Sequence, residues 1–314
     1  VVPYGAGSSP DVIARIMGEK LATRLGQPVI VENRVGGGGN NGTGSVAKSP
    51  GDGYTYVIST NGPLVYNTVL YKKLPYDPFT ELRPVVLAGG QANVCTVRAD
   101  SGINSLQELV AAMKKNPGKF NFSSTGVGSL SQLGVELLKV KTDTYAVHIP
   151  YASSPLAVLA ILQGDVQFAC VPAVAVLPQV KAGKLRTLAV STAQRSQLTP
   201  DIPTMKEAGL PEIENLAWMA LMAPATTPND IVQRMNQEAG KAMTSGRAAG
   251  IEVTEDSLSV EVIADTCING PGHYLGSEQT LTLMQKDYVY PAIGNRMSPK
   301  EWAEAGKPDL VERA

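Results

Sequence analysis

The chain opens with VVPYGAGSSPDVIARIMGEKLATRLG (residues 1–26), and this stretch decides the fold class. An apolar pair comes first, then a turn rich in glycine and serine, and then a helical spacing of apolar residues. The spacing predicts a helix over about residues 10–25, with Ser9 as its N-cap, Pro10 at its first position and Gly26 at its end. The order of strand, turn and helix is typical of one unit of an α/β protein.

The same order repeats along most of the sequence. PVIVEN (28–33) is expected to be a short buried strand, and GYTYVIST (53–60) alternates like a strand. Residues 105–140, 145–171 and 185–192 continue the scheme, followed by a strand within 214–228 and a helix within 229–246. This alternation predicts an α/β fold with largely parallel sheets. After Gly246 the rhythm stops, and residues 247–314 are expected to form a separate, mainly helical tail with a Gly-Pro-Gly break.

Composition excludes several classes of protein. The 314 residues carry a formal charge of −1 without a basic stripe, so a nucleic-acid partner is not expected. No apolar run approaches the roughly 20 residues of a membrane span, so direct membrane insertion is not expected either. The cysteines (Cys95, Cys170, Cys267) and histidines (His148, His273) are scattered. The sequence therefore predicts no metal site, no disulfide framework and no cofactor.

Two loops have the layout of an anion site. Tyr4–Ser9 leads into the helix that begins near Pro10, and Ser123–Ser129 leads into a second predicted helix near Leu130. Unpaired N–H groups and the helix dipole favour an anion at such positions, and the hydroxyl groups add donors. The alternative is a pair of ordinary turns with capping serines.

Nucleotide and catalytic motifs are weak. GAGSSP (5–10) has two of the three glycines of a dinucleotide fingerprint, and GGGGNNGTGS (36–45) has no P-loop lysine. A dinucleotide-dependent oxidoreductase is therefore the weakest hypothesis. Neither histidine has an acid at a recognisable spacing, and His148 suits a structural role at a strand end better than that of a base. Asp11 could bind a ligand amine or, more simply, favour the helix N-terminus.

The combined motifs resemble a known family. VVPYGAGSSPDVIAR, VIVENRVGGGGNNGTGSVAKSPGDGYTYVISTNG, NPGKFNFSSTGVGSLSQLGVELLK and HIPYASSPLAVLAILQGDVQF occur in the same order in Bug-type solute-binding receptors of tripartite tricarboxylate transporters. The resemblance covers about residues 1–243. It implies a type II-like, two-lobed periplasmic binding protein fold with a ligand cleft between the lobes.

The resemblance also implies a function and a site. The chain is expected to be a periplasmic binding protein rather than an enzyme, which captures a small carboxylate for the membrane subunits of a transporter. Lobe 1 is expected to comprise residues 1–94 and 218–246, and lobe 2 residues 95–217. Main-chain donors and ordered waters are expected to hold the carboxylate. The predicted ligand-binding residues are Tyr4, Gly5, Ala6, Gly7, Ser8, Ser9, Asp11, Thr60, Asn61, Ser124, Thr125, Gly126, Gly128 and Ser129.

Two departures from the family pattern bear on these expectations. Many members carry an Asp-Asn pair where this sequence has Val171 and Pro172, which favours a mono- or dicarboxylate or an aromatic acid over an amino acid. The sequence also begins at Val1 rather than at a methionine, which a removed signal peptide or a piece of a longer chain would equally explain.

The end of the chain resembles a different family. GPGHYLGSEQTLTLMQKDYVYPAIGNRMSPKEWAEAGKPDL, within about residues 251–314, is similar to the C-terminal piece of trimethylamine methyltransferases. Those enzymes are corrinoid-dependent barrels, and a complete barrel needs about 250 residues. The alternative function is therefore a methyltransferase-related fusion with a partial catalytic segment, which would demethylate quaternary amines.

Overall fold

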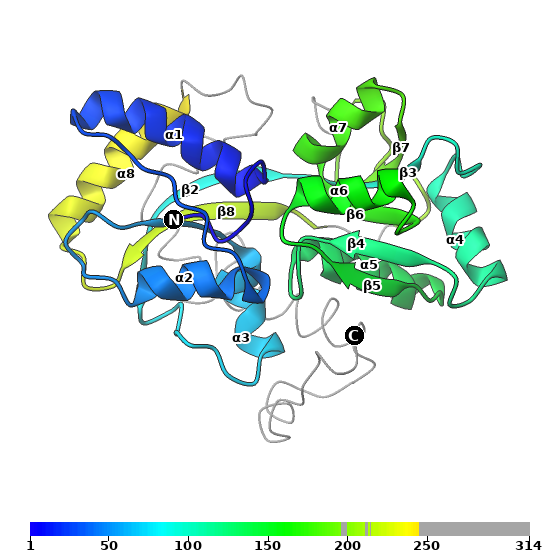
Figure 1. The fold of residues 1–314 in the computed structure, drawn as a ribbon, viewed down its shortest axis with the longest axis horizontal. Helices are drawn as coiled ribbons and strands as arrows, with labels where there is room; N and C mark the ends of the chain where they lie inside the picture. Colours follow the sequence, from blue (N-terminus) through cyan, green and yellow to red (C-terminus); the bar gives the residue numbers. More distant parts are fainter. Residues whose placement is uncertain (196–199, 211–212, 214, 245–314) are drawn as a thin grey trace. The chain divides into compact units, whose positions relative to one another are not determined.

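The computed structural model describes residues 1–195, 200–210, 213 and 215–244. Within these residues the chain forms two compact units. Unit 1 comprises residues 1–90 and 218–244, and unit 2 comprises residues 91–217. Figure 1 labels their helices and strands. The tail expected over residues 247–314 lies outside the described residues.

Each unit is a sheet with helices on both faces. Unit 1 contains α1 (Ser9–Leu25), the 3₁₀-helix η1 (Gly37–Gly39), α2 (Asn40–Ala47), β1 (Val57–Thr60), the π-helix η2 (Gly62–Tyr66), α3 (Asn67–Leu70), β2 (Leu82–Gln91), β8 (Ala217–Pro224) and α8 (Asn229–Thr244). Unit 2 contains β3 (Asn93–Arg98), α4 (Leu106–Lys115), β4 (Asn121–Ser124), α5 (Leu130–Thr142), β5 (Val147–Pro150), α6 (Ser154–Gln163), β6 (Phe168–Pro172), α7 (Ala173–Lys181) and β7 (Leu185–Val190). The end of β2 and the start of β8 mark the two points where the chain passes between the units.

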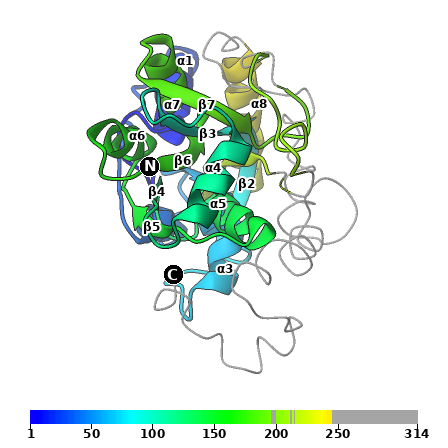
Figure 2. The ribbon, with the colours of Figure 1, turned by 90° about the vertical axis from the view of Figure 1, so that its right-hand side faces the viewer.

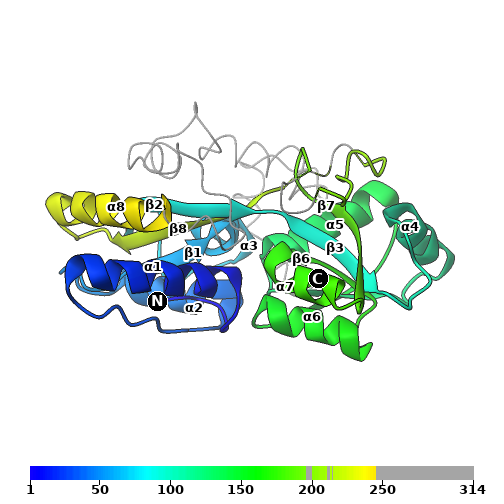
Figure 3. The ribbon, with the colours of Figure 1, turned by 90° about the horizontal axis from the view of Figure 1, so that it is seen from above.

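The sheet of unit 1 is buried on both faces. Its strands have the order β1-β8-β2, with β8 antiparallel to β1. Successive side chains of a strand point to opposite faces, so β8 contributes to two cores. Helices α1 and α8 cover one face side by side (Figure 3), and α2 and η2 cover the other. The β8 residues that face α1 and α8 are Met219, Leu221 and Ala223, whereas Trp218, Ala220 and Met222 face α2 and η2.

The sheet of unit 2 has the order β5-β4-β6-β3-β7. Helices α4 and α5 cover one face, and α6 and α7 cover the other (Figure 2). Phe168 and Cys170 of β6 face α4 and α5, whereas Ala169 and Val171 face α6 and α7. Val171 is therefore a buried core residue.

The prediction of largely parallel sheets is wrong in part. Strand β4 runs parallel to β5 and β6, as helix crossovers require, but β3 is antiparallel to both β6 and β7. In unit 1 the pairing of β1 with β8 is also antiparallel. The antiparallel partners β1 and β8, and likewise β3 and β6, are far apart in sequence. Local alternation of apolar residues carries no information about the relative direction of such strands.

The segment PVIVEN is not the buried strand that was predicted. Within the described structure, residues 28–33 belong to no sheet, and only a single bridge joins Asn33 to Val2. Ile30 is 82% exposed. The segment instead runs along α1, where a Cβ built at Gly18 would lie 3.2 Å from Val29. A segment that packs on a helix in this way needs apolar residues, so its sequence resembles that of a buried strand although it joins no sheet.

Two cysteines lie opposite one another in the sheet of unit 2. Cys95 of β3 pairs with Cys170 of β6, both side chains are buried, and the two form a disulfide. The sequence did not predict a disulfide framework, and this bond corrects that expectation. They are 75 residues apart in sequence, and only the register of two antiparallel strands brings them together. Such a bond suits an oxidising compartment.

The disulfide should contribute measurably to stability. Because it closes a loop of 75 residues, replacing both Cys95 and Cys170 by alanine should lower the free energy of unfolding by about 2–4 kcal/mol. Urea unfolding with and without a reductant measures this. The reductant should destabilise the unaltered protein and leave the double variant unchanged. Equal loss in both proteins would contradict the bond's role.

Candidate functional site

The first predicted loop ends at the start of α1. Ser8, rather than the predicted Ser9, is the N-cap residue, with extended backbone angles. The helix therefore begins one residue earlier than predicted, and Pro10 is its second residue rather than its first. The Ser8 side chain is 3% exposed, and its hydroxyl makes no capping bond. Among the described residues, this buried hydroxyl has no hydrogen-bond partner. A polar group in that position is costly unless something pairs with it.

Asp11 holds this loop in place from the first turn of α1. Its Oδ2 accepts a bond from the Gly7 amide at 2.9 Å and from Arg15 Nε at 3.0 Å. Its Oδ1 accepts from Arg15 Nη2 at 3.0 Å and from Asn33 Nδ2 at 2.8 Å. Asn33 Nδ2 also donates to the carbonyl of Tyr4 at 2.9 Å. One carboxylate therefore joins both ends of the loop to the helix.

The charge of Asp11 is stabilised by these donors. Burial alone would raise the pKa of the carboxyl, but the bonds from Arg15, Gly7 and Asn33 together hold it below the ordinary value of 3.8. The side chain is 3% exposed, while Arg15 is 53% exposed. Both carboxylate oxygens are thus occupied by the protein's own donors. This arrangement suits the organisation of the loop better than contact with a ligand amine.

The loop also reaches the end of β1. Tyr4 Oη lies 2.7 Å from Thr60 Oγ1, so the structure brings together two residues predicted for the site that are 56 residues apart in sequence. Burial raises the pKa of Tyr4 to about 12, and its phenol is neutral at ordinary pH. Asn61, the next predicted residue, precedes η2, and its Nδ2 donates to Tyr66 Oη at 3.1 Å.

One contact of Tyr4 was missed from the sequence. Gly36–Gly39 all have φ values between 57° and 123°, which glycine adopts at little cost. A Cβ at Gly39 would lie 3.0 Å from Tyr4 Oη and 2.7 Å from Pro63 Cγ. The sequence signal for this contact is the run of four glycines, which does not form a P-loop because residues 36–45 contain no lysine. These glycines let the chain pass close to Tyr4.

In the second predicted loop, side-chain hydroxyl groups accept hydrogen bonds from main-chain amides. The Thr125 amide donates to Ser131 Oγ at 3.0 Å, and Thr125 Oγ1 lies 3.0 Å from the same atom. Ser129 is the N-cap of α5, and its hydroxyl donates to the Gly126 carbonyl at 2.6 Å. Ser129 Oγ also lies 2.9 Å from Ser131 Oγ, so three side chains of one turn form a connected group.

Two glycine amides of this loop are occupied in the same way. The Gly126 amide donates to Ser124 Oγ at 3.1 Å, and the Gly128 amide donates to Gln132 Oε1 at 2.8 Å. Both glycines have positive φ, 123° and 79°, so a larger residue at either position would strain the backbone. The close approach of a ligand is therefore not the only reason for glycine here.

The structure shows which main-chain donors of the two loops have partners in the protein itself. The main chain of the two loops was expected to face a ligand. The amides of Gly7, Thr125, Gly126 and Gly128 each donate to a side chain of the loop itself or of the helix that follows it. At the first loop, the Ser8 hydroxyl is buried and has no partner among the described residues. Within the described residues, no group of three or more His, Cys, Asp or Glu side chains could hold a metal ion. No helix in that part of the chain is long and apolar enough to cross a membrane.

Two family models match the sequence. The model for the tripartite tricarboxylate transporter family receptor matches residues 13–261. The model for trimethylamine methyltransferase matches residues 235–314, so the two matches overlap at residues 235–261. The resemblance noted for the end of the chain is therefore confirmed, and it begins within α8 rather than at residue 251.

Individual proteins agree with the first family. BugT of Bordetella pertussis is 37% identical over 246 residues, which are 78% of this chain and 76% of BugT. The structure of the periplasmic binding protein BugD is 29% identical, with a TM-score of 0.82 and coverage of 91% of this chain and 95% of BugD. MatC from Rhodopseudomonas palustris, solved with bound malate, is 28% identical with a TM-score of 0.79, covering 84% of this chain and 92% of MatC.

These likenesses confirm the expected periplasmic binding protein class of fold. The match of the family model includes the second loop, Ser123–Ser129, whereas the first loop lies in residues 1–12, which precede the match. On the extent of that match and on the identity to BugT, the chain belongs to the tripartite tricarboxylate transporter family receptors.

Proposed function

We propose that this receptor captures a small mono- or dicarboxylate, or an aromatic acid, in the periplasm and delivers it to the membrane subunits of a transporter. The family supports the role of a receptor rather than an enzyme. MatC, which shares the fold, was solved with malate. The match to trimethylamine methyltransferase is confined to residues 235–314 and adds no observation in favour of methyl transfer.

The single observation that carries the proposal is the unpartnered hydroxyl of Ser8. It is buried at the N-terminal end of α1, where the helix dipole favours negative charge. A carboxylate oxygen that accepts a bond from this hydroxyl would satisfy the buried group and interact with the dipole at once. The loop around it is already held by Asp11, so little ordering would accompany binding.

The first test is Ser8→Ala. Affinity for malate should fall about 10- to 100-fold, the worth of one hydrogen bond to a charged group. The ligand-free protein should unfold at the same or a higher urea concentration, because an unpaired buried hydroxyl is removed. Isothermal titration and urea unfolding measure the two effects.

Thr227→Val is the matched control for this test. Thr227 Oγ1 is also buried without a partner among the described residues, but it lies in the connection between β8 and α8. Its removal should change stability in the same direction and leave malate affinity unchanged. Unaltered affinity in Ser8→Ala would refute the assignment of Ser8.

The second test is Asp11→Asn, which cannot accept all four bonds. We expect a loss of about 2–3 kcal/mol in stability near neutral pH, together with weaker malate binding. Because the pKa of folded Asp11 lies below its unfolded value, the stabilisation is complete above about pH 5 and disappears as the pH falls through the folded pKa. The difference between the two proteins should therefore shrink below about pH 4.

Urea unfolding across this pH range measures the difference. Glu32→Gln serves as the control, because Glu32 pairs with Arg34 on the surface, where ion pairs contribute little. A stability difference that stays constant down to pH 3 would show that the Asp11 charge is not what holds the loop.

A ligand panel tests the proposed class of substrate. Malate, succinate, adipate and benzoate should include at least one ligand that binds at micromolar concentration. Aspartate and glutamate should bind far more weakly, because Val171 and Pro172 stand where many relatives have an Asp-Asn pair, and Val171 is buried. Calorimetric titration makes the comparison. Tight binding of aspartate would contradict the proposal.

A further inference from the structure

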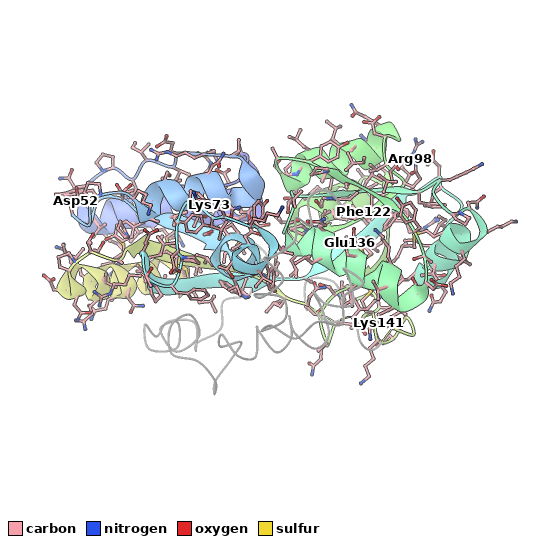
Figure 4. The ribbon with its side chains drawn as sticks, turned by 90° about the horizontal axis from the view of Figure 1, so that it is seen from below. Asp52, Lys73, Arg98, Phe122, Glu136 and Lys141 are labelled. Carbon is pink, nitrogen blue, oxygen red and sulfur yellow. A yellow bond between two sulfur atoms is a disulfide. The ribbon has the colours of Figure 1, made fainter. Side chains whose placement is uncertain are left out.

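His148 is a buried titratable residue that the proposed function does not use. It lies on β5, directly opposite Phe122 of β4 in parallel register, and its side chain is 9% exposed. Its ring stacks on that of Phe122, with centroids 5.0 Å apart and an angle of 27° between the planes. Figure 4 labels Phe122 among the strands of unit 2. The stacking fixes the direction in which the ring nitrogens point.

One ring nitrogen reaches the second loop. His148 Nε2 lies 2.5 Å from Ser124 Oγ, and both side chains are buried. The same Oγ accepts a bond from the Gly126 amide at 3.1 Å. Since that bond uses a lone pair of the hydroxyl, the hydroxyl proton is available for His148 Nε2. With Nε2 as the unprotonated nitrogen, the atoms form a chain in which Gly126 N–H donates to Ser124 and Ser124 O–H donates to His148.

The surroundings of His148 keep its ring neutral. Burial is the main cause, and the positive charge of Lys139 is the second, of a pKa lowered to about 4. Lys139 extends from α5, lies 5.4 Å from the centre of the Phe122 ring and pairs with Glu136 at 2.6 Å. A neutral imidazole has one unprotonated nitrogen, which can accept the Ser124 proton.

The bond has a consequence for the geometry of the loop. Gly126 is held at a φ of 123°, and its carbonyl accepts the hydroxyl of Ser129, the N-cap of α5. Ser124 therefore connects the strand end to the turn, and His148 fixes the orientation of the Ser124 hydroxyl. Without an acceptor at His148, that hydroxyl could turn to the Gly126 carbonyl, 3.2 Å away, and compete with Ser129.

We propose that His148 is a positioning residue for loop Ser123–Ser129. Its Nε2 accepts the Ser124 hydroxyl, which keeps Ser124 Oγ in place as the acceptor of the Gly126 amide and so holds the turn in the shape that carboxylate binding requires. Ser124 acts in this arrangement as the connection between His148 and Gly126 rather than as a ligand contact. The proposal rests on the proposed function for its effect on affinity. Its effect on the loop is measurable without any ligand.

The experiment compares His148→Phe, His148→Gln and Ser124→Ala in the ligand-free protein. Phenylalanine keeps a ring against Phe122 and removes the acceptor, whereas glutamine restores an acceptor close to the position of Nε2. Hydrogen exchange of the Gly126 amide should quicken about tenfold in His148→Phe and in Ser124→Ala, the worth of one hydrogen bond. It should return toward the original rate in His148→Gln. Nitrogen NMR should show Nε2 of the unaltered protein to be unprotonated.

Ser123→Ala is the matched control. Ser123 precedes Ser124 on β4, and its buried hydroxyl donates to the Ala157 carbonyl at 2.8 Å. This variant should lose stability and leave exchange at Gly126 unchanged. Malate affinity should fall about threefold to thirtyfold in His148→Phe and recover in His148→Gln, following the worth of one hydrogen bond.

The outcomes separate the two proposals. A protonated Nε2, or unchanged exchange at Gly126 in His148→Phe, overturns the positioning role whatever the ligand. Faster exchange with unchanged malate affinity overturns its link to binding. If the unaltered protein binds no member of the carboxylate panel, the proposed function fails, and the exchange data still decide whether His148 holds the loop.

Discussion

The four hydrogen bonds to the Asp11 carboxylate are the interaction on which the first loop depends. They connect α1, the Gly7 turn and Asn33, which belongs to a segment outside the sheet. A buried carboxylate is stable only when such donors surround it. The same group that satisfies the loop amide therefore prevents the loop from moving away from the helix. Beside it, the Ser8 hydroxyl is buried without a partner among the described residues.

The second loop reaches a similar result with neutral groups. Ser124, Ser131 and Gln132 occupy its amides, and Ser129 caps α5. Hydroxyl and amide side chains can turn and exchange partners at low cost, unlike an ion pair that is already desolvated. A neutral histidine behind Ser124 supplies the fixed acceptor that such a group otherwise lacks. The two loops thus combine similar backbone layouts with different electrostatics.

Much of the fold was predictable because its signals are local. The apolar spacing of α1, the alternation in residues 53–60 and the loop before Leu130 predicted α1, β1 and the start of α5. The prediction failed for residues 28–33, where packing on Gly18 produces the pattern of a buried strand, and for Cys95 and Cys170, whose bond depends on strand register. The positions of both site loops were predictable, because glycine and serine before a helix are visible in sequence. The partners of their amides were not.

The sequence by itself determined that two serine-rich loops precede helices, and its motifs placed the chain among the carboxylate receptors. Only the tertiary structure decided which donors of those loops are occupied, since Asp11 reaches Asn33, Tyr4 reaches Thr60 and Ser124 reaches His148 across stretches of chain that no periodicity relates. The physical reason is that a buried polar group must find its partner in space. Spacing along the chain reports local backbone preferences, whereas pairing depends on how strands and helices pack.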